Sequence, residues 1–220
     1  RYHRIRAPEF VVVPLGAKLS RPPRFPFPMI VKSDTAHGSV GIAQASFVTD
    51  EKKLAERVAF IHDQLRTDAI VEQYIDGREL YVAVLGNDRL ATLPVWEFFL
   101  EKLPDGAPRI VTARMKWSHE YQERTGITTG AAKDLPNGAE KSISNLCKRI
   151  YRALGQTGYA RMDLRLTPEG HVYLLESNPN PQLARGEDLA DSAQLAGISY
   201  ESLLQRIVKL GLASRKTWNA

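Results

Sequence analysis

The chain has 220 residues, of which 43% are hydrophobic and 25% charged, a composition that is ordinary for a globular protein with a sizeable core. The formal net charge of +5 suits an anionic ligand such as a nucleotide. The basic residues are scattered, with no interleaved aromatic residues of the kind that bind RNA. This pattern argues against a nucleic-acid-binding protein.

Cysteine usage and hydropathy restrict the class of protein further. Cys147 is the only cysteine, which excludes an internal disulfide and a C-x-x-C metal site. Its neighbours predict an apolar helical face, where a buried and inert thiol is expected. We find no signal-peptide pattern and no apolar stretch approaching the length of a membrane span, so a cytoplasmic protein without membrane association is expected. The chain begins with Arg, which suggests a fragment or the remainder of something longer.

In chain order, the first half of the sequence is expected to be rich in short strands. Hydrophobic runs predict strands at residues 10–13, 29–32, 40–48, 69–74, 78–85 and 89–95. A proline-rich stretch at residues 21–28 predicts an extended connector after the first strand. Apolar residues spaced by three and four predict an amphipathic helix over residues 50–66. The sequence Gly86-Asn87-Asp88 predicts the turn of a hairpin.

The second half is expected to begin irregularly and to end with a hairpin and helices. Glycine and proline punctuate residues 97–136, and a connection of that length is usually functional or disordered. Regular elements then follow: a helix at about 138–155, strands at 159–166 and 171–178, and helical segments to about 212. Strand pairs with flanking helices predict an α+β fold whose two lobes meet near residues 75–78.

The strand at residues 159–166 alternates polar and apolar side chains. One face is therefore predicted to carry Tyr159, Arg161, Asp163 and Arg165. Residues 167–170, Thr-Pro-Glu-Gly, have the composition of a tight turn. A regular hairpin closed by this turn would pair Leu166 with His171.

That register would gather five polar groups on one face of the hairpin. It places Arg161 opposite Glu176, Tyr159 opposite Asn178, and Asp163 diagonal to Glu176. Two apolar residues share this face in the same register, Val172 and Leu174. A solvated sheet face with one cross-strand ion pair is one interpretation. The other is a Mg²⁺ site, because two carboxylates and an amide oxygen are hard ligands, and a neighbouring arginine can stabilise a transferred phosphoryl group.

Longer motifs follow one another along the chain. They are Pro28–Lys32 (PMIVK), His37–Gly41 (HGSVG), Val71–Glu79 (VEQYIDGRE), and Gly158–Leu164 (GYARMDL) with Tyr173–Pro181 (YLLESNPNP). In this order they resemble the ATP-binding lysine strand, the phosphate loop, the hinge and the catalytic end of ATP-grasp ligases, most closely the D-alanine–D-alanine ligase group. The resemblance covers nearly the whole chain. It implies two α+β lobes, residues 1–76 and 77–220, with the nucleotide held between antiparallel sheets.

The resemblance also implies a set of ATP contacts. Phosphates would be bound by the side chains of Lys32 and Lys116 and by the small-residue loop with Gly38, Ser39 and Gly41. The base and ribose would be bound by Glu72, by the backbone of Gln73, Tyr74 and Ile75, and by Glu79. Taken singly, these residues have plainer interpretations: an edge-strand lysine, a hairpin turn and a surface carboxylate at a strand end.

By the same resemblance, Arg161 would steady the transferred phosphate. Asp163, Glu176 and Asn178 would hold Mg²⁺, two ions by analogy, with Mn²⁺ as an alternative. The implied reaction joins a small-molecule carboxylate and an amine, amino acids among them, through an acyl phosphate, with release of ADP. A homodimer is left open. The alternative is a nucleotide-binding ATP-grasp module without catalysis, acting in regulation or assembly.

The substrate half of the sequence departs from the D-alanine enzymes. Gly38-Ser39 stands where two adjacent serines are usual, and Trp117 follows the loop lysine where tyrosine is usual. Pro181-Gln182-Leu183 stands where Pro-Gly-Met is usual. The amino-terminal lobe that helps to bind the first D-alanine in that group is not among these residues. The resemblance therefore leaves the use of D-alanine open.

Overall fold

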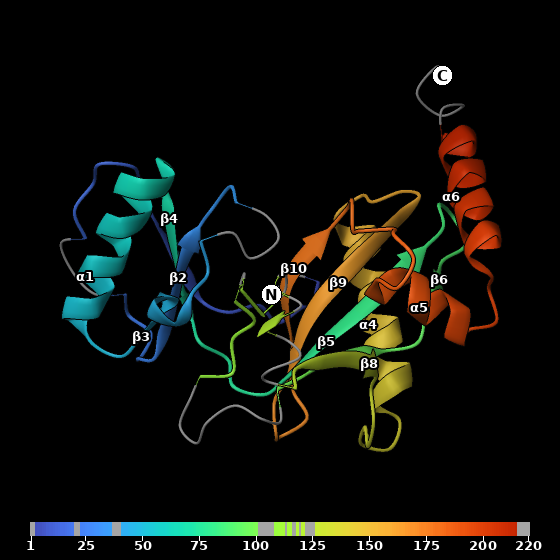
Figure 1. The fold of residues 1–220 in the computed structure, drawn as a ribbon, viewed down its shortest axis with the longest axis horizontal. Coiled ribbons are helices and arrows are strands. Elements are labelled where there is room, and N and C mark those ends of the chain that lie inside the picture. Colours follow the sequence, from blue (N-terminus) through green and yellow to red (C-terminus); the bar gives the residue numbers. More distant parts are fainter. Residues whose placement is uncertain are drawn as a thin grey trace. The chain divides into compact units, whose positions relative to one another are not determined.

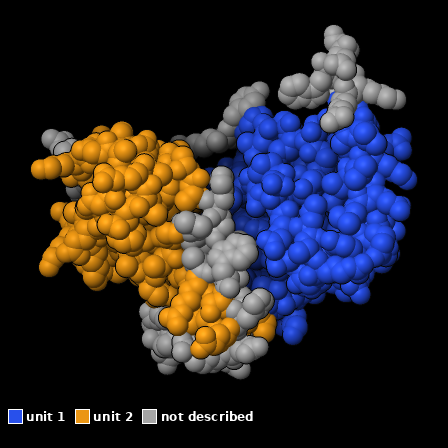
Figure 2. All heavy atoms as spheres, turned by 45° about the horizontal axis from the view of Figure 1, so that its top comes forward, with its two compact units in different colours: residues 1–7, 77–99, 129–220 blue, residues 8–76, 100–128 orange. Residues whose placement is uncertain are grey.

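The chain folds into two compact units (Figure 2), and each has its own hydrophobic core. The computed structural model describes residues 3–19, 23–36, 41–100, 108–112, 114–115, 118, 120–121 and 126–214. Unit 1 contains residues 1–7, 77–99 and 129–220, and unit 2 contains residues 8–76 and 100–128. The chain passes between them four times, after residues 7, 76, 99 and 128, and the expected lobes divide at the second of these points. Two segments group differently from the expected lobes. Residues 1–7 were expected in the amino-terminal lobe but belong to unit 1, and residues 100–128 were expected in the carboxy-terminal lobe but belong to unit 2.

Unit 2 contains a four-stranded antiparallel sheet with a helix across one face (Figure 1). In sheet order the strands are β1 (Phe10–Val13), β4 (Ala69–Gln73), β2 (Met29–Ser33) and β3 (Phe47–Val48). The helical segments are η1 (Gln44–Ser46), α1 (Glu51–Phe60) and η2 (Ile61–Leu65). Asp50 caps α1 by accepting a hydrogen bond from the Lys53 N–H at 2.9 Å. The strand expected at residues 40–48 is reduced to β3, because η1 occupies the residues before it.

The core of unit 2 lies between α1 and the facing side of the sheet. Alternate strand residues point toward the helix, and the most buried are Met29, Val31, Val48, Ala69 and Val71. The helical segments contribute Leu54, Val58 and Ile61 to the same cluster. The alternation therefore places Lys32 and Glu72 on the face of the sheet that α1 does not cover.

Unit 1 contains a larger sheet with helices on both faces (Figure 1). In sheet order the strands are β10 (Val172–Asn178), β9 (Tyr159–Leu166), β5 (Arg78–Leu85), β7 (Trp96–Phe99) and β8 (Thr128–Ala131), while β6 (Ala91–Thr92) pairs with β5. The helices are α4 (Ala139–Ala153), α5 (Asp188–Leu195) and α6 (Tyr200–Ser214). The strand expected at 89–95 is only two residues long. The region expected to be irregular contains both β7 and β8.

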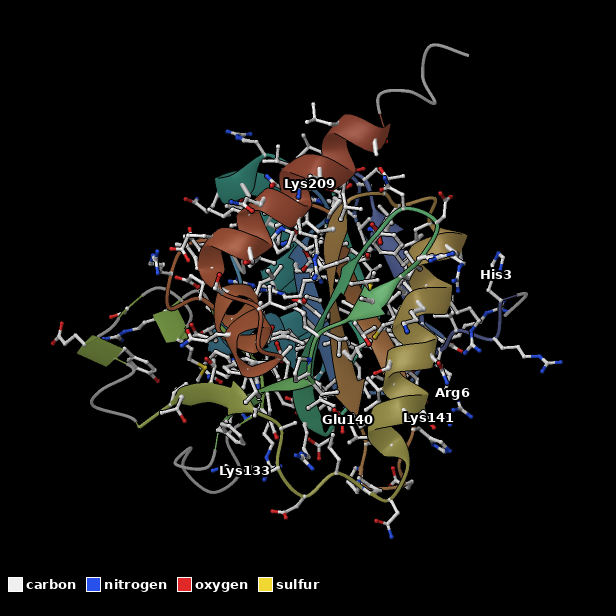
Figure 3. The ribbon with its side chains drawn as sticks, turned by 90° about the vertical axis from the view of Figure 1, so that its right-hand side faces the viewer. His3, Arg6, Lys133, Glu140, Lys141 and Lys209 are labelled. Atoms are coloured by element: carbon white, nitrogen blue, oxygen red, sulfur yellow. The ribbon has the colours of Figure 1, made fainter. Side chains whose placement is uncertain are left out.

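Helix α4 covers one face of this sheet with Ile143, Cys147, Ile150 and Tyr151, which pack on alternate residues of β5 and β9. Helices α5 and α6 cover one end of the other face, around Ala83, Leu85, Leu189 and Leu203. Charged side chains on the outer sides of the helices are exposed, as Figure 3 shows for Glu140, Lys141 and Lys209. The remainder of the second face carries polar residues of β5 and β9. The expected α+β class is confirmed.

Within the described residues, no helix has the length and apolar character needed to cross a membrane.

Candidate active site

The β9–β10 hairpin has a different register from the regular one expected. Val172, rather than His171, lies opposite Leu166. The turn closes when the Thr167 N–H donates to the His171 carbonyl at 2.9 Å, so His171 belongs to the turn. Val172 and Leu174 consequently pack on the core beneath α4. The expectation that they share the polar face is wrong.

A β-bulge then changes the direction of the side chains further along β10. The extra residue is Leu175, since the ladder continues with Glu176 opposite Asp163 and Asn178 opposite Arg161. In an uninterrupted strand, the alternation would turn Glu176 and Asn178 toward the core. The expected Arg161–Glu176 and Tyr159–Asn178 pairs are therefore wrong, although Arg161, Asp163, Glu176 and Asn178 do share one face.

Arg161 and Asp163 form a bidentate ion pair within β9. The distances are 2.7 Å from Nε to Oδ1 and 2.8 Å from Nη2 to Oδ2, and each residue is 7% exposed. Asp188, at the start of α5, places Oδ2 3.9 Å from Nη1 of Arg161. Burial by itself lowers the pKa of the Arg161 guanidinium, but the charge and hydrogen bonds of Asp163 outweigh it, so the pKa is raised. The guanidinium therefore stays charged.

Strand β5 adds two buried residues to the same face. Glu79 lies opposite Arg165 and Tyr81 lies opposite Asp163. One carboxylate oxygen of Glu79 accepts from Arg165 Nη2 at 2.8 Å, and the other accepts from the Tyr81 hydroxyl at 2.9 Å. The guanidinium carbon of Arg161 lies 4.5 Å from the centre of the Tyr81 ring. These contacts form a continuous network across the two strands.

Tyr81 and Asp188 are absent from the sequence-based set of site residues. The available signal for Tyr81 was the strand alternation, which places it on the same face as Glu79 two residues earlier. Burial raises the pKa of Tyr81 well above its usual value, and the charges of Glu79 and Asp163 add to this shift while Arg161 opposes it. The hydroxyl therefore remains a hydrogen-bond donor.

The hairpin supplies oxygen ligands of the kind that Mg²⁺ prefers. Glu176 is exposed and lies directly opposite Asp163, and the half-buried Asn178 accepts from the Asn180 N–H at 2.9 Å through Oδ1. The described part of the chain has no group of three or more His, Cys, Asp or Glu side chains suited to a metal. Two carboxylates and one amide oxygen nevertheless fit a hard cation whose remaining ligands come from phosphates and water.

In unit 2, Lys32 and Glu72 are brought together on the open face of the sheet. Lys32 Nζ lies 2.9 Å from Glu72 Oε2, and the two side chains are 25% and 15% exposed. Lys32 lies opposite Ile70, and Glu72 lies opposite both Ile30 and Phe10, so the two charged residues are diagonal neighbours. A largely apolar strip thus surrounds one ion pair.

The segment after Glu72, which the resemblance implies is the adenine hinge, is held by backbone hydrogen bonds. The Gln73 N–H donates to the Glu9 carbonyl at 2.8 Å, and the Tyr74 N–H donates to the Pro28 carbonyl at 3.2 Å. Ile75 is buried. Any backbone hydrogen bond between a nucleotide and Gln73 or Tyr74 therefore has to be accepted by one of their carbonyl oxygens, because both N–H groups already donate within the protein.

The phosphate-loop and loop-lysine predictions fall partly outside the described residues, namely at Gly38, Ser39 and Lys116. Gly41, at the end of the loop, has a φ of 76°, and a Cβ there would lie 2.6 Å from Leu65 Cδ1. Its carbonyl accepts a hydrogen bond from the buried Arg57. The end of the loop is thereby fixed against α1 and η2.

The fold is that of the ATP-grasp ligases. The D-alanine–D-alanine ligase of Bacillus anthracis, solved with ATP, has a TM-score of 0.73 and 21% identity over 99% of this chain and 64% of its own. The VanG D-Ala:D-Ser ligase of Enterococcus faecalis has a TM-score of 0.70 and 25% identity over 95% of this chain and 58% of its own.

The chain belongs to the D-ala D-ala ligase C-terminus family, whose model matches residues 15–209. A D-alanine–D-alanine ligase of Bordetella petrii is 32% identical over 209 residues, 94% of this chain and 59% of the relative. The uncharacterized protein y4sG of Sinorhizobium fredii is 32% identical over 208 residues, 93% of this chain and 57% of the relative. The chain thus spans less than two thirds of the length of these relatives.

Proposed function

We propose that this chain is the ATP-binding and catalytic part of an ATP-dependent carboxylate–amine ligase. The observation that carries the proposal is the polar face of β9 and β10, where the buried Arg161–Asp163 pair lies beside Glu176 and Asn178. A bulge is needed to bring the two β10 residues to that face, and bulges are frequent beside active sites. Membership of the ligase family supports the same reaction class.

In this proposal, ATP is bound by the residues that the resemblance to ATP-grasp ligases implies. Lys32, Lys116 and the loop containing Gly38, Ser39 and Gly41 bind the phosphates. Glu72 and the segment Gln73, Tyr74 and Ile75 bind the adenine, and Glu79 accepts from the ribose hydroxyls. The common face of Lys32 and Glu72 supports this assignment, because the two side chains are close enough to contact one nucleotide.

Asp163, Glu176 and Asn178 would hold Mg²⁺, with Mn²⁺ as an alternative. Bound there, the ion would neutralise charge on the phosphates. The positive charge of Arg161 stabilises the γ-phosphoryl group. Asp163 fixes the orientation of the Arg161 guanidinium for this role. A carboxylate oxygen of the acid attacks the γ-phosphorus, and the bond to the bridging oxygen of ADP breaks. The amine nitrogen then attacks the acyl carbon, the bond from that carbon to the phosphate oxygen breaks, and the nitrogen gives up a proton to water, which yields an amide and free phosphate.

One observation favours a second candidate, a nucleotide-binding module without turnover. Both carboxylate oxygens of Asp163 already accept hydrogen bonds from Arg161. If this pair persists with nucleotide bound, Asp163 has only its remaining lone pairs for a metal. Such a module would bind ATP and serve regulation or assembly.

Nucleotide binding and ADP release separate these candidates. A ligase is expected to show Mg²⁺-dependent protection by ATP against thermal unfolding, and ADP release that requires both a carboxylate and an amine. A screen across D- and L-amino acids would also identify the substrates. Protection without ADP release supports the module, and the absence of any ATP binding contradicts both candidates.

Replacing Glu176 by alanine tests the proposed metal ligands. Because Glu176 is exposed, Glu176→Ala is expected to shift the melting temperature by no more than about 2 °C. ADP release should fall roughly a hundredfold or more. Glu169→Ala, in the exposed turn of the same hairpin, is the matched control and should keep its activity. Full activity in Glu176→Ala would remove this residue from the site.

A further inference from the structure

We infer that Tyr81 is a positioning residue that serves two functional groups at once: its hydroxyl fixes Glu79 and its ring supports Arg161. The inference deepens the proposed function and rests on it, because it assigns Glu79 to the ribose and Arg161 to the γ-phosphate. Tyr81 is itself only 2% exposed, and the proposed function does not include a contact between Tyr81 and the nucleotide. Its effect is transmitted through the two residues that it holds.

The hydroxyl of Tyr81 helps to fix the orientation of the Glu79 carboxylate. Tyr81 donates to Oε1 at 2.9 Å and Arg165 donates to Oε2 at 2.8 Å, so each oxygen has one donor among the residues that the structure describes. Arg165 is anchored in turn by its hydrogen bond to the Gly77 carbonyl at 3.0 Å. A carboxylate has about four acceptor positions, which leaves capacity for two further donors. Two neighbouring ribose hydroxyls match this remaining capacity.

The aromatic ring of Tyr81 supports the guanidinium of Arg161. Its guanidinium is bound at the edge by Asp163 and is covered by the Tyr81 ring, with 4.5 Å between the guanidinium carbon and the ring centre. The attraction between a cation and an aromatic face is stronger in a buried site, and Arg161 is 7% exposed. The guanidinium therefore has a fixed plane as well as a fixed position.

The register of the sheet explains why one side chain reaches both groups. Tyr81 lies directly opposite Asp163 and follows Glu79 by two residues on the same face of β5. The Phe98 ring meets the Tyr81 ring edge to face, with centres 6.5 Å apart, and limits its rotation. Tyr81 is thus packed between the ribose carboxylate and the phosphate arginine.

Two substitutions separate the role of the Tyr81 hydroxyl from the role of its ring, and measurements of nucleotide binding are enough to compare them. Tyr81→Phe removes the hydroxyl and keeps the ring. We expect the preference for ATP over 2′,3′-dideoxy-ATP to fall about threefold or more, since a hydrogen bond to a charged group is lost. The preference for ATP over ADP, which reports on the γ-phosphate, should stay within about twofold.

Tyr81→Leu removes the ring as well. The preference for ATP over ADP is then expected to fall by about three- to tenfold in addition to the loss of ribose preference. Both preferences are measured by calorimetry with Mg²⁺ present. Being ratios of affinities, they do not change when the folded protein is merely less stable.

Tyr151→Phe is the matched control, because it also removes a buried tyrosine hydroxyl from unit 1. That hydroxyl donates to the Gly86 carbonyl at 2.8 Å on the face covered by α4. The control should lower stability and leave both preferences unchanged. The inference is overturned if wild-type protein binds ATP but both Tyr81 variants keep both preferences, or if Tyr151→Phe changes them equally. Failure of the wild-type chain to bind ATP would instead contradict the proposed function.

Discussion

The guanidinium of Arg165 lies in the interior of unit 1, where an unpaired charge is costly. Its contact with Glu79 supplies the opposite charge, as Asp163 does for Arg161. Removing one member of such a pair leaves the other buried and uncompensated, which is more destabilising than losing an exposed pair. Substitutions in this network therefore need shape-conserving variants, such as Tyr81→Phe, to separate a functional effect from a loss of stability.

Lys32 offers a simpler test at the residue scale. Lys32→Met should lower the affinity for ATP about tenfold or more, because a cation on the proposed nucleotide face is lost. The control is Lys53→Met, which removes a lysine paired with Asp50 at 3.4 Å on an exposed helix face. Isothermal calorimetry with ATP and Mg²⁺ measures both. An unchanged affinity in Lys32→Met would exclude this lysine from the phosphate site.

Among the elements, strand β10 shows how one local irregularity changes the direction of the side chains that follow it. Before the bulge its inward residues join the core under α4, and after it the same alternation would bury Glu176. One additional residue, Leu175, reverses the side on which every later side chain lies. The face of the sheet on which the proposed metal ligands lie thus depends on the register of β10 along its whole length.

A deletion and an insertion test this role of the bulge. Deleting Leu175 removes the extra residue and should leave Glu176 opposite Asp163, so Mg²⁺-dependent ATP binding is expected to persist. Inserting glycine between Leu175 and Glu176 shifts the strand by one residue and should turn Glu176 toward the core. We expect the insertion to weaken the Mg²⁺-dependent part of ATP binding about tenfold or more. Equal loss in both variants would contradict this account of the bulge.

At the scale of the whole molecule, each hydrophobic cluster of the described residues lies within one unit, two in unit 1 and one in unit 2. Leu54 belongs to the cluster of unit 2, and Leu164 belongs to the larger cluster of unit 1, which also contains Cys147. Cys147 is fully buried, and burial raises its pKa to about 12. Because the thiolate is the reactive form, a thiol reagent can modify Cys147 only after unit 1 opens.

Cysteine labelling therefore reports on the opening of unit 1. Leu164→Ala is expected to cost about 2–5 kcal/mol and to accelerate labelling at least tenfold. Leu54→Ala removes an equally buried leucine from unit 2 and should accelerate labelling much less. The measurement is the rate of modification at constant reagent concentration. Equal acceleration by both substitutions would show that the units unfold as one cooperative structure.

The sequence by itself determined the parts of the proposed site that are contiguous in the chain. The segment Val71–Glu79 contains the proposed hinge, and the alternation of β9 placed Arg161 and Asp163 on one face, because strand periodicity is a local property. The α+β class was predictable for the same reason, since the runs that formed β4, β5 and α4 carry their own periodicity. The lengths of β3 and β6 were not predictable from the sequence, because the formation of so short a strand depends on the strands that pair with it.

Only the tertiary structure decided which residues of different strands face one another. The turn at His171 and the bulge at Leu175 change the register by one residue each, and hydrophobic alternation does not reveal such shifts. The contact between Tyr81 and Arg161 depends on the pairing of β5 with β9, which are far apart in the sequence. The sequence therefore indicated which chemical groups to propose for the site, whereas long-range strand pairing decided which of them lie together.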